Sequence, residues 1–292
     1  MTTVACIPAF NEEGVIGNLI KKTLSYVDSV VVCDDGSSDN TIKEAEKSGA
    51  FVLKHGENKG KGAALKTLFD HARHSEFDII VTIDGDGQFL PNEIKKLTKP
   101  IQEKSADIVV GYRFDDSTEM PSYRKFGNKI LDHATNIVTN LPIRDTQSGF
   151  RAYSKKAIDS IEFSNDGFTA DSEILISASE NGLRISEEKI TVIYDTGHKT
   201  STKNPVSHAG GVLGSLIEII LVRHPLKYLG LPGIASILVG LGFLSYTFTV
   251  YNETLLLPIS LALISFTTLT LGFLLVLSSG ILFSINRSVF HK

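Results

Sequence analysis

Two aspartates separated by a single residue, Asp84 and Asp86, are the groups in this chain whose type and spacing point most directly to chemistry. They follow residues 79–83, an apolar run that predicts a buried strand, so both carboxylates come where the chain leaves a sheet. The neighbouring glycines let the backbone bend, and Gln88 adds an amide oxygen. Oxygen ligands at this density suit Mg²⁺ or Mn²⁺, hard cations that often bridge phosphates. A solvated acidic turn would have the same sequence, because Asp-x-Asp is short and common.

The elements that must position these carboxylates alternate between strand and helix. Strands are expected at residues 4–7, 29–33, 50–53, 79–83 and 107–111, with helices beginning near residues 11, 41 and 63. This alternation predicts an α/β fold with a mostly parallel sheet covered by helices. Ligands of such sheets bind beyond the carboxyl ends of the strands. Polar clusters lie at those ends, and they contain Asn11, Asp35, Lys61 and Asp84.

The glycine- and lysine-rich loop at residues 58–62 opens a helix, a setting that suits a phosphate group. It lacks the spacing of a P-loop, and no G-x-G-x-x-G follows the first strand, which argues against a dinucleotide enzyme. A mobile surface loop is the alternative for this segment. Asp171, which precedes an apolar helix, could likewise be only its N-cap.

Composition narrows the class of protein. The net charge of the 292 residues is -4, which gives no reason to expect nucleic-acid binding. Cys6 and Cys33 lie in apolar, strand-like runs, so buried free thiols are expected rather than a disulfide framework or a zinc site.

Two uncharged stretches near the C-terminus, residues 229–250 and 255–285, are each long enough to cross a bilayer core that needs about 20 residues. Residues 251–254 alone separate them, which predicts a tight antiparallel transmembrane hairpin; a buried hairpin in a soluble protein is the alternative. We therefore expect a catalytic domain at residues 1–205, a juxtamembrane segment at 206–228 and a membrane domain at 229–292. Within the juxtamembrane segment, residues 212–222 could form an amphipathic surface helix or a core helix.

Basic residues flank the outer ends of the hairpin, whereas its loop carries only Glu253. The positive-inside rule then predicts a multi-pass cell-membrane protein whose catalytic domain and both termini are cytoplasmic. Small residues along both stretches would allow close helix packing and could support a homo-oligomer. The flanking basic residues are Arg223, His224, Lys227, Arg287 and Lys292.

Six segments, taken together and in order, resemble the family 2 glycosyltransferases, and within them the polyprenyl-phosphate hexose synthases of the dolichyl-phosphate mannose synthase group. The resemblance implies the type A glycosyltransferase fold, a single α/β sandwich. Residues 204–216 and 223–230 also look like the juxtamembrane region of archaeal members. The segments are IPAFNEE (7–13), DDGSSDNT (34–41), NKGKGAAL (58–65), DGDGQ (84–88), DTQSGFRAY (145–153) and TADSEIL (169–175).

On the donor side, the resemblance implies that Asp84 lies by the ribose and diphosphate and joins Asp86 and Gln88 around a Mg²⁺ or Mn²⁺ ion. Lys61 would lie near the nucleotide. Gly85 stands where alanine is common in the family. The donor nucleoside would be held by Pro8, Ala9, Asn11, Glu12 and Asp35.

On the acceptor side, Arg113, Arg124 and Asn128 resemble positions where a guanidinium can grip a lipid phosphate. Gln147, Ser148 and Asp171 would line the sugar pocket, Gln147 towards the donor and Ser148 towards the acceptor. Lys199, in a basic segment that matches loosely, could contact a phosphate or headgroup or simply form a basic fringe. Asp86, both arginines and Asp171 are the expected catalytic residues.

The implied reaction is inverting transfer of one hexose from a nucleotide-diphosphate sugar, GDP-mannose or UDP-glucose, to a dolichyl or other polyprenyl phosphate. The chain contains no tryptophan, so it lacks the Q-x-x-R-W motif of processive synthases. Three alternatives stay open. The transferred sugar could be another one, such as an N-acetylhexosamine; the lipid acceptor could be a different one; or the protein could be a non-catalytic membrane scaffold that binds nucleotide sugar.

Overall fold

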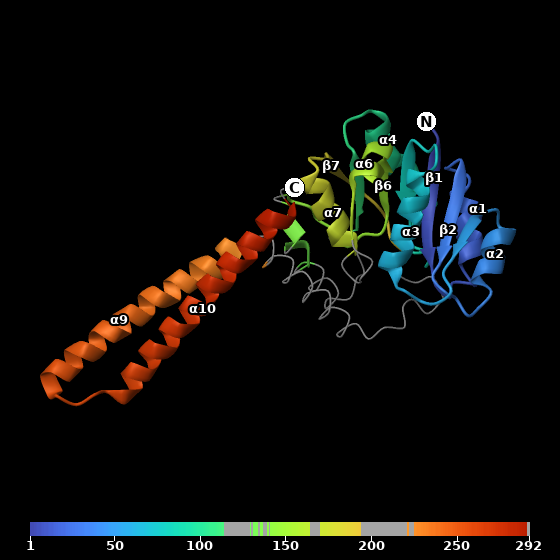
Figure 1. The fold of residues 1–292 in the computed structure, drawn as a ribbon. Helices are drawn as coiled ribbons and strands as arrows, with labels where there is room; N and C mark the ends of the chain where they lie inside the picture. The colour runs from blue at the N-terminus through green and yellow to red at the C-terminus, as the bar shows by residue number, and fades with distance from the viewer. Residues whose placement is uncertain are drawn as a thin grey trace. The chain divides into compact units, whose positions relative to one another are not determined.

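The computed structural model describes residues 1–113, 129, 131–133, 135–136, 139, 141–163, 170–193, 221 and 225–290. Arg124, Asn128 and Lys199 lie outside these residues, as do most of residues 206–228. The chain divides into two compact units, Met1–Gly214 and Ser215–Lys292, and each is described by itself (Figure 1).

The described part of the first unit is built on a sheet of seven strands in the order β3-β2-β1-β4-β6-β5-β7. Neighbouring strands are parallel except that β6 runs antiparallel to both β4 and β5. The sheet is therefore mostly parallel, as the alternation of elements predicts. The strands are β1 (Thr3–Ala9), β2 (Ser29–Asp34), β3 (Phe51–Lys54), β4 (Ile79–Thr82), β5 (Ile108–Tyr112), β6 (Arg151–Ser154) and β7 (Ile185–Lys189).

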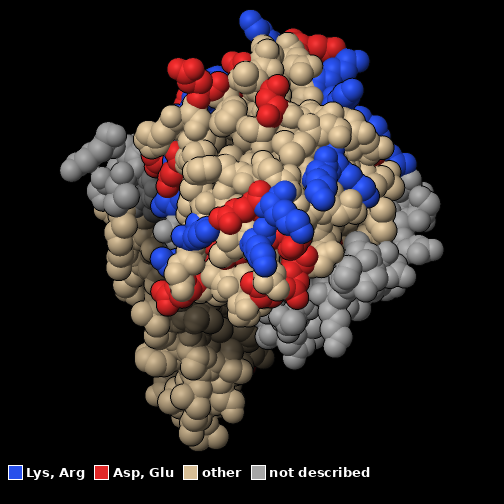
Figure 2. All heavy atoms as spheres, turned by 90° about the vertical axis from the view of Figure 1, so that its right-hand side faces the viewer, with Lys and Arg blue, Asp and Glu red and all other residues tan. Residues whose placement is uncertain are grey.

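Helices cover both faces of this sheet (Figure 1). Side chains alternate along each buried strand: Val4 and Cys6 of β1 pack with α3, α6 and α7, whereas Ala5 and Ile7 pack with α1, α2 and α4. Both cysteines are buried and free. The helices are α1 (Ile16–Thr23), α2 (Thr41–Lys47), α3 (Lys61–Arg73), the short 3₁₀ helix η1 (Pro91–Glu93), α4 (Ile94–Gln102), α6 (Lys155–Ser160) and α7 (Ala170–Glu180). Figure 2 shows acidic and basic side chains interspersed on the face of this unit that carries α1 and α2.

The antiparallel direction of strand β6 determines which loop lies at the edge of the sheet formed by the carboxyl ends of the parallel strands. Sequence patterning does not anticipate β6 or β7, because RAYS in β6 and the charged ISEEK in β7 lack a continuous apolar run. Since β6 runs against β4, the loop that precedes β6 lies at the same edge as the carboxyl ends of the parallel strands. Residues 145–150 are thereby brought beside the turn that follows β4.

The second unit contains two long helices, α9 (Leu231–Thr254) and α10 (Ile259–Phe290), preceded by the π-helical turn η2 (Leu226–Gly230). The expected loop at residues 251–254 is wrong, because these residues form the last turn of α9. The helix ends instead at Leu255, which is left-handed with φ of 58°, and residues 255–258 make the connection. Pro258 has no N–H to continue a helix, so the next one begins just after it.

Small residues hold α9 and α10 close together. A Cβ on Gly272 would lie 2.7 Å from the carbonyl oxygen of Gly233, so the two backbones touch there. The hydroxyl of Ser236 donates to the carbonyl of Thr268 at 2.8 Å, which gives a polar link in an apolar setting. Most large apolar side chains of both helices are exposed, and their length and composition fit a transmembrane hairpin.

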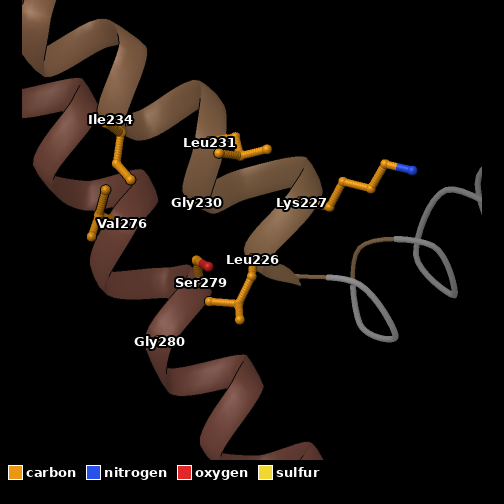
Figure 3. Close-up of a pocket in the computed structure, with 8 residues that line it drawn as sticks. All are labelled: Leu226, Lys227, Gly230, Leu231, Ile234, Val276, Ser279 and Gly280. Atoms are coloured by element: carbon orange, nitrogen blue, oxygen red, sulfur yellow. The ribbon is translucent and has the colours of Figure 1, made fainter.

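An open groove lies between η2 and the facing part of α10 (Figure 3). Leu226, Leu231, Ile234 and Val276 supply apolar side chains to its lining, and Lys227 extends away from the helices. Apart from the Lys227 amine, the groove is lined mainly by apolar and small residues, like the rest of the hairpin surface.

Candidate active site

The turn after β4 lies directly against the end of β1. A Cβ on Gly85 would lie 3.0 Å from the carbonyl oxygen of Pro8 and 3.5 Å from the Cβ of Ala9. Pro8 and Ala9 are themselves buried in the strand. The close approach explains why glycine suits position 85, and it joins two of the segments that the sequence places at one edge.

Lys61 connects three separate elements at the centre of this edge. Its ammonium group lies 2.9 Å from Asp84 Oδ1, after β4, and 3.1 Å from Asp171 Oδ2, in the first turn of α7. Lys61 is the first residue of α3, and it follows Gly60, whose φ of 94° favours glycine. Three predicted site residues from distant parts of the chain therefore meet in direct contact.

Negative charge accumulates beside this contact. Burial, followed by the charge of Asp84, raises the pKa of Asp86 to about 6. Burial also raises the pKa of Glu12 to about 7, together with the charges of Asp86, Asp39 and Asp84. Both shifts mean that added negative charge is unfavourable here, so an incoming cation would be stabilised.

The Asp84 and Asp86 carboxylates fit a divalent cation that is shared with a ligand. Within the described residues there is no group of three or more His, Cys, Asp or Glu side chains arranged as a metal cage. Magnesium, however, is usually held by one or two carboxylates together with substrate phosphates. The Lys61 ammonium is a cation already seated against Asp84, and Gly149 leaves room for that carboxylate because a Cβ there would overlap it. Gln88 is buried, and its backbone N–H donates to Asp86 Oδ1 at 3.0 Å.

Asp35 fixes the glycine-rich loop. Its Oδ1 lies 2.7 Å from the ring nitrogen Nδ1 of His55 and accepts the backbone N–H of Lys59 at 3.0 Å. Its Oδ2 accepts the N–H of Gly60 at 2.7 Å. The buried carboxylate thus sets where the loop ends and where α3, with Lys61 at its start, begins.

Asn11 and Glu12 join the loops that follow β1 and β2. Asn11 has a left-handed backbone with φ of 55°, and its N–H donates to Ser37 Oγ at 2.8 Å. Its side-chain oxygen accepts the N–H of Ser38 at 2.8 Å. The N–H of Glu12 donates to Thr41 Oγ1 at 2.7 Å. These contacts place the Glu12 carboxylate close enough to Asp86 and Asp84 for the charge effect described above.

Arg113, just beyond β5, is held by two parallel hydrogen bonds. Its Nε donates to Asp145 Oδ2 at 2.7 Å and its second guanidinium nitrogen to Oδ1 at 2.8 Å. Asp145 is fully buried, while Arg113 keeps 14% of its side chain exposed. The fork is therefore oriented by a carboxylate that solvent does not reach.

Gln147 and Ser148 lie in the loop that leads into β6. The Gln147 amide donates to Ser172 Oγ at 2.7 Å, whereas the Ser148 side chain is completely buried. Arg151 is also fully buried, and its guanidinium donates to the carbonyls of Ser148, Asp171 and Thr146. This one side chain ties the 145–150 loop to the first turn of α7.

Sequence reasoning assigned no role to Asp145, Arg151 or His55. The first two lie inside the segment 145–153 that carries the family resemblance, but no strand is expected there, so nothing in the sequence shows that their charged side chains are buried. His55 offers no signal either, because only the pairing of β2 with β3 brings it to Asp35.

Similarity to known proteins identifies the family of this chain. The family model described as glycosyl transferase family 2 matches residues 4–162, more than half of the chain. A UDP-N-acetylglucosamine–dolichyl-phosphate N-acetylglucosaminyltransferase of Methanococcus voltae is 36% identical over 211 residues, which cover 64% of this chain and 84% of that protein. A dolichyl-phosphate hexose transferase of Haloferax volcanii is 28% identical over 222 residues, covering 75% and 93%.

Among solved structures, the fold is similar to that of glucosyl-3-phosphoglycerate synthase from Mycobacterium tuberculosis, solved with Mn²⁺, UDP and phosphoglyceric acid. The TM-score is 0.59 at 22% identity, covering 76% of this chain and 78% of that one. The similarity confirms the expected type A glycosyltransferase architecture. By its sequence and its fold, this chain belongs to glycosyl transferase family 2.

Proposed function

We propose that this glycosyltransferase moves one hexose from a nucleotide-diphosphate sugar to dolichyl phosphate or a related polyprenyl phosphate. The observation that carries the proposal is the contact of Asp84, Lys61 and Asp171 at the carboxyl ends of the strands, beside Asp86. The two relatives named for dolichyl-phosphate transfer support the acceptor class, and the apolar hairpin suits an enzyme whose acceptor is a membrane lipid.

In this proposal the chain's own side chains bind and orient both substrates. Asp84, Asp86 and Gln88 would hold a Mg²⁺ or Mn²⁺ ion, whose chemistry is to stabilise charge on the leaving diphosphate. Arg113, oriented by Asp145, would bind the acceptor phosphate through its guanidinium group. That phosphate is already ionised near neutral pH, so little general-base help is needed and direct displacement inverts the anomeric carbon.

The donor residues follow from the same edge of the sheet. Asn11, Glu12 and Asp35, with the strand end at Pro8 and Ala9, surround the nucleoside, and Lys61 reaches the diphosphate. Gln147 and Asp171 line the sugar, with the buried Ser148 beneath them. Arg124, Asn128 and Lys199 complete the acceptor side in this proposal.

We further propose that residues 229–292 anchor the enzyme as two membrane spans, with residues 206–228 at the interface and residues 1–205 in the cytoplasm. Basic residues flank the outer ends of the spans, and the positive-inside rule then assigns that side to the cytoplasm. An N-acetylhexosamine donor is the second candidate, favoured by the name of the Methanococcus voltae relative.

The test is a transfer assay with the purified full chain in detergent, dolichyl phosphate and Mn²⁺ or Mg²⁺. Radiolabelled GDP-mannose, UDP-glucose and UDP-N-acetylglucosamine are compared as donors. Label that enters lipid from one donor and is lost with EDTA supports the proposal and identifies the sugar. Absence of label from all three, in folded protein, would contradict it.

A variant pair makes the test residue-specific. Asp86→Ala is expected to reduce transfer by about 1,000-fold while the protein remains folded, because a carboxylate of the charged centre is removed. Glu103→Ala removes a carboxylate that is 59% exposed, and it should leave transfer unchanged. Full activity of Asp86→Ala would remove Asp86 from the site.

A further inference from the structure

Lys61 makes two strong contacts with residues that are expected to serve a different cation and a sugar. Its ammonium lies 2.9 Å from Asp84 Oδ1 and 3.1 Å from Asp171 Oδ2. A lysine ammonium carries a full positive charge near neutral pH, so a cation already lies against the oxygen that a divalent cation would need.

Two cations cannot share that oxygen at low cost. Like charges a few ångströms apart repel strongly near a protein surface, where the effective dielectric constant is well below that of water. A divalent ion that binds Asp84 must therefore displace the ammonium or bind more weakly beside it. Lys61 is able to move, because 39% of its side chain is exposed and its stem is flexible.

If the Lys61 ammonium moved away, its two partners, Asp84 and Asp171, would be left with different charges around them. Asp171 keeps another cation close by, since a guanidinium nitrogen of Arg151 lies 3.8 Å from its Oδ1. Among the described residues, the ion pair of Asp84 is with Lys61, and Asp86 adds further negative charge next to it. Departure of Lys61 therefore leaves Asp84 without this cation, whereas Asp171 stays near Arg151 and Asp86 stays within the influence of Arg113.

We propose that Lys61 is an internal counter-cation that occupies Asp84 until a nucleoside diphosphate draws its ammonium away and a divalent cation takes its place. This inference rests on the proposed function, because it assumes that donor and metal meet at Asp84. The diphosphate supplies the anion that Lys61 loses, and the metal supplies the cation that Asp84 loses. Lys61 thereby couples the two binding events, each of which favours the other.

The inference is tested by binding, without turnover. Mn²⁺ affinity is measured by electron paramagnetic resonance on the full chain in detergent, with no nucleotide and then with UDP or GDP. Lys61→Met keeps the length of the stem and removes the charge. We expect this variant to bind Mn²⁺ about tenfold more tightly than the wild type without nucleotide, because the competing charge is gone.

Nucleotide should also raise the Mn²⁺ affinity of Lys61→Met by a smaller factor than that of the wild type, because the displacement step no longer contributes. Lys66→Met, which removes a charge elsewhere on α3, serves as the matched control and should match the wild type in both measurements. Lys61→Arg, which keeps the charge, should not gain Mn²⁺ affinity without nucleotide. Thermal unfolding of each variant shows that it is folded.

The outcomes separate this inference from the proposed function. Equal or weaker Mn²⁺ binding by Lys61→Met without nucleotide, in folded protein, overturns the counter-cation role even where sugar transfer is observed. The expected gain in affinity supports that role even where no donor transfers label to dolichyl phosphate. Failure of the wild type to bind Mn²⁺ with or without nucleotide overturns both the counter-cation role and the metal dependence.

Discussion

The carboxylate of Asp84 is confined by its neighbours as much as by its own backbone. Lys61 contacts Oδ1, and the missing side chain of Gly149 leaves the space that the carboxylate fills. Orientation of a reacting group to within a fraction of an ångström is worth orders of magnitude in rate. Under the proposed function, residues that never touch substrate would therefore influence transfer through the position of Asp84.

Gly149→Ala is expected to lower sugar transfer by about 100-fold, because the new methyl group overlaps the Asp84 carboxylate and displaces it from Lys61. The measurement is the transfer rate at saturating donor and acceptor. Gly56→Ala is the control, since a Cβ at Gly56 meets nothing within 4 Å. A Gly149→Ala enzyme as fast as the control would show that the position of Asp84 is not critical.

Asp145→Asn tests how Arg113 is oriented. The substitution removes the charge that holds the guanidinium fork, so we expect the acceptor KM to rise about tenfold, equivalent to ~1.4 kcal/mol. The donor KM should change little, because the nucleoside-binding residues belong to other loops. Steady-state kinetics with each substrate varied in turn separate the two effects, and an equal rise in both KM values would point to general disruption.

The elements of the first unit show which parts of the fold can be predicted from patterns in the sequence. The first five strands, β1 to β5, are predicted because their apolar runs are bounded by polar clusters, as at residues 29–34 and 79–84, whereas α4 and α6 are not predicted. Both site carboxylates after β4 are found because they follow one of these apolar runs. β6 and β7 are not found, because neither RAYS nor ISEEK contains the continuous apolar run that marks the other strands. The contact of Lys61 with Asp171 spans 110 residues, and only tertiary structure reveals it.

A pair of hydrogen-bonded charges links the start of β5 to the start of β7. Arg184 donates to both carboxylate oxygens of Asp107 and, mainly through these bonds, holds the pKa of Asp107 at about 2. A lowered pKa means that this carboxylate stabilises the fold above the unfolded-state pKa of about 4, and that the stabilisation is lost as pH falls towards 2.

Arg184→Met should therefore lower the melting temperature of the detergent-solubilised chain at pH 7. The difference from the wild type should shrink as the pH is lowered from about 4 towards 2, where Asp107 becomes protonated in both proteins. Circular dichroism melts across this range provide the measurement. A difference that stays constant with pH would mean that Arg184 acts by packing rather than by charge.

At the scale of the whole molecule, a catalytic fold and an apolar hairpin occur in one chain, and they use glycine differently. In the hairpin, Gly233 and Gly272 allow two backbones to touch, whereas in the catalytic unit Gly85 and Gly149 clear space around a functional turn. The sequence predicts both units from the abrupt change in composition near residue 229. It misplaces the hairpin turn, because polar residues 251–254 extend α9 by a further turn before Leu255 ends it.

Gly272→Val is expected to lower the melting temperature of the chain in detergent, because the new side chain meets the Gly233 carbonyl and forces α9 and α10 apart. Gly242→Val is the matched control, as a Cβ there meets nothing within 4 Å. The temperature at which protein is lost from the soluble fraction, measured by size-exclusion chromatography after heating, compares the variants. Equal losses for both would show that helix contact at Gly272 adds no stability.

The order of the strands also bears on solubility. The outermost described strands, β3 and β7, are four and five residues long, and both carry charges. Lys54 of β3 is paired with Glu46, and β7 contains Glu187, Glu188 and Lys189. Short, charged edge strands discourage edge-to-edge pairing with another chain, which would otherwise lead to aggregation. Self-association that extends this folded sheet through its described edges is therefore disfavoured.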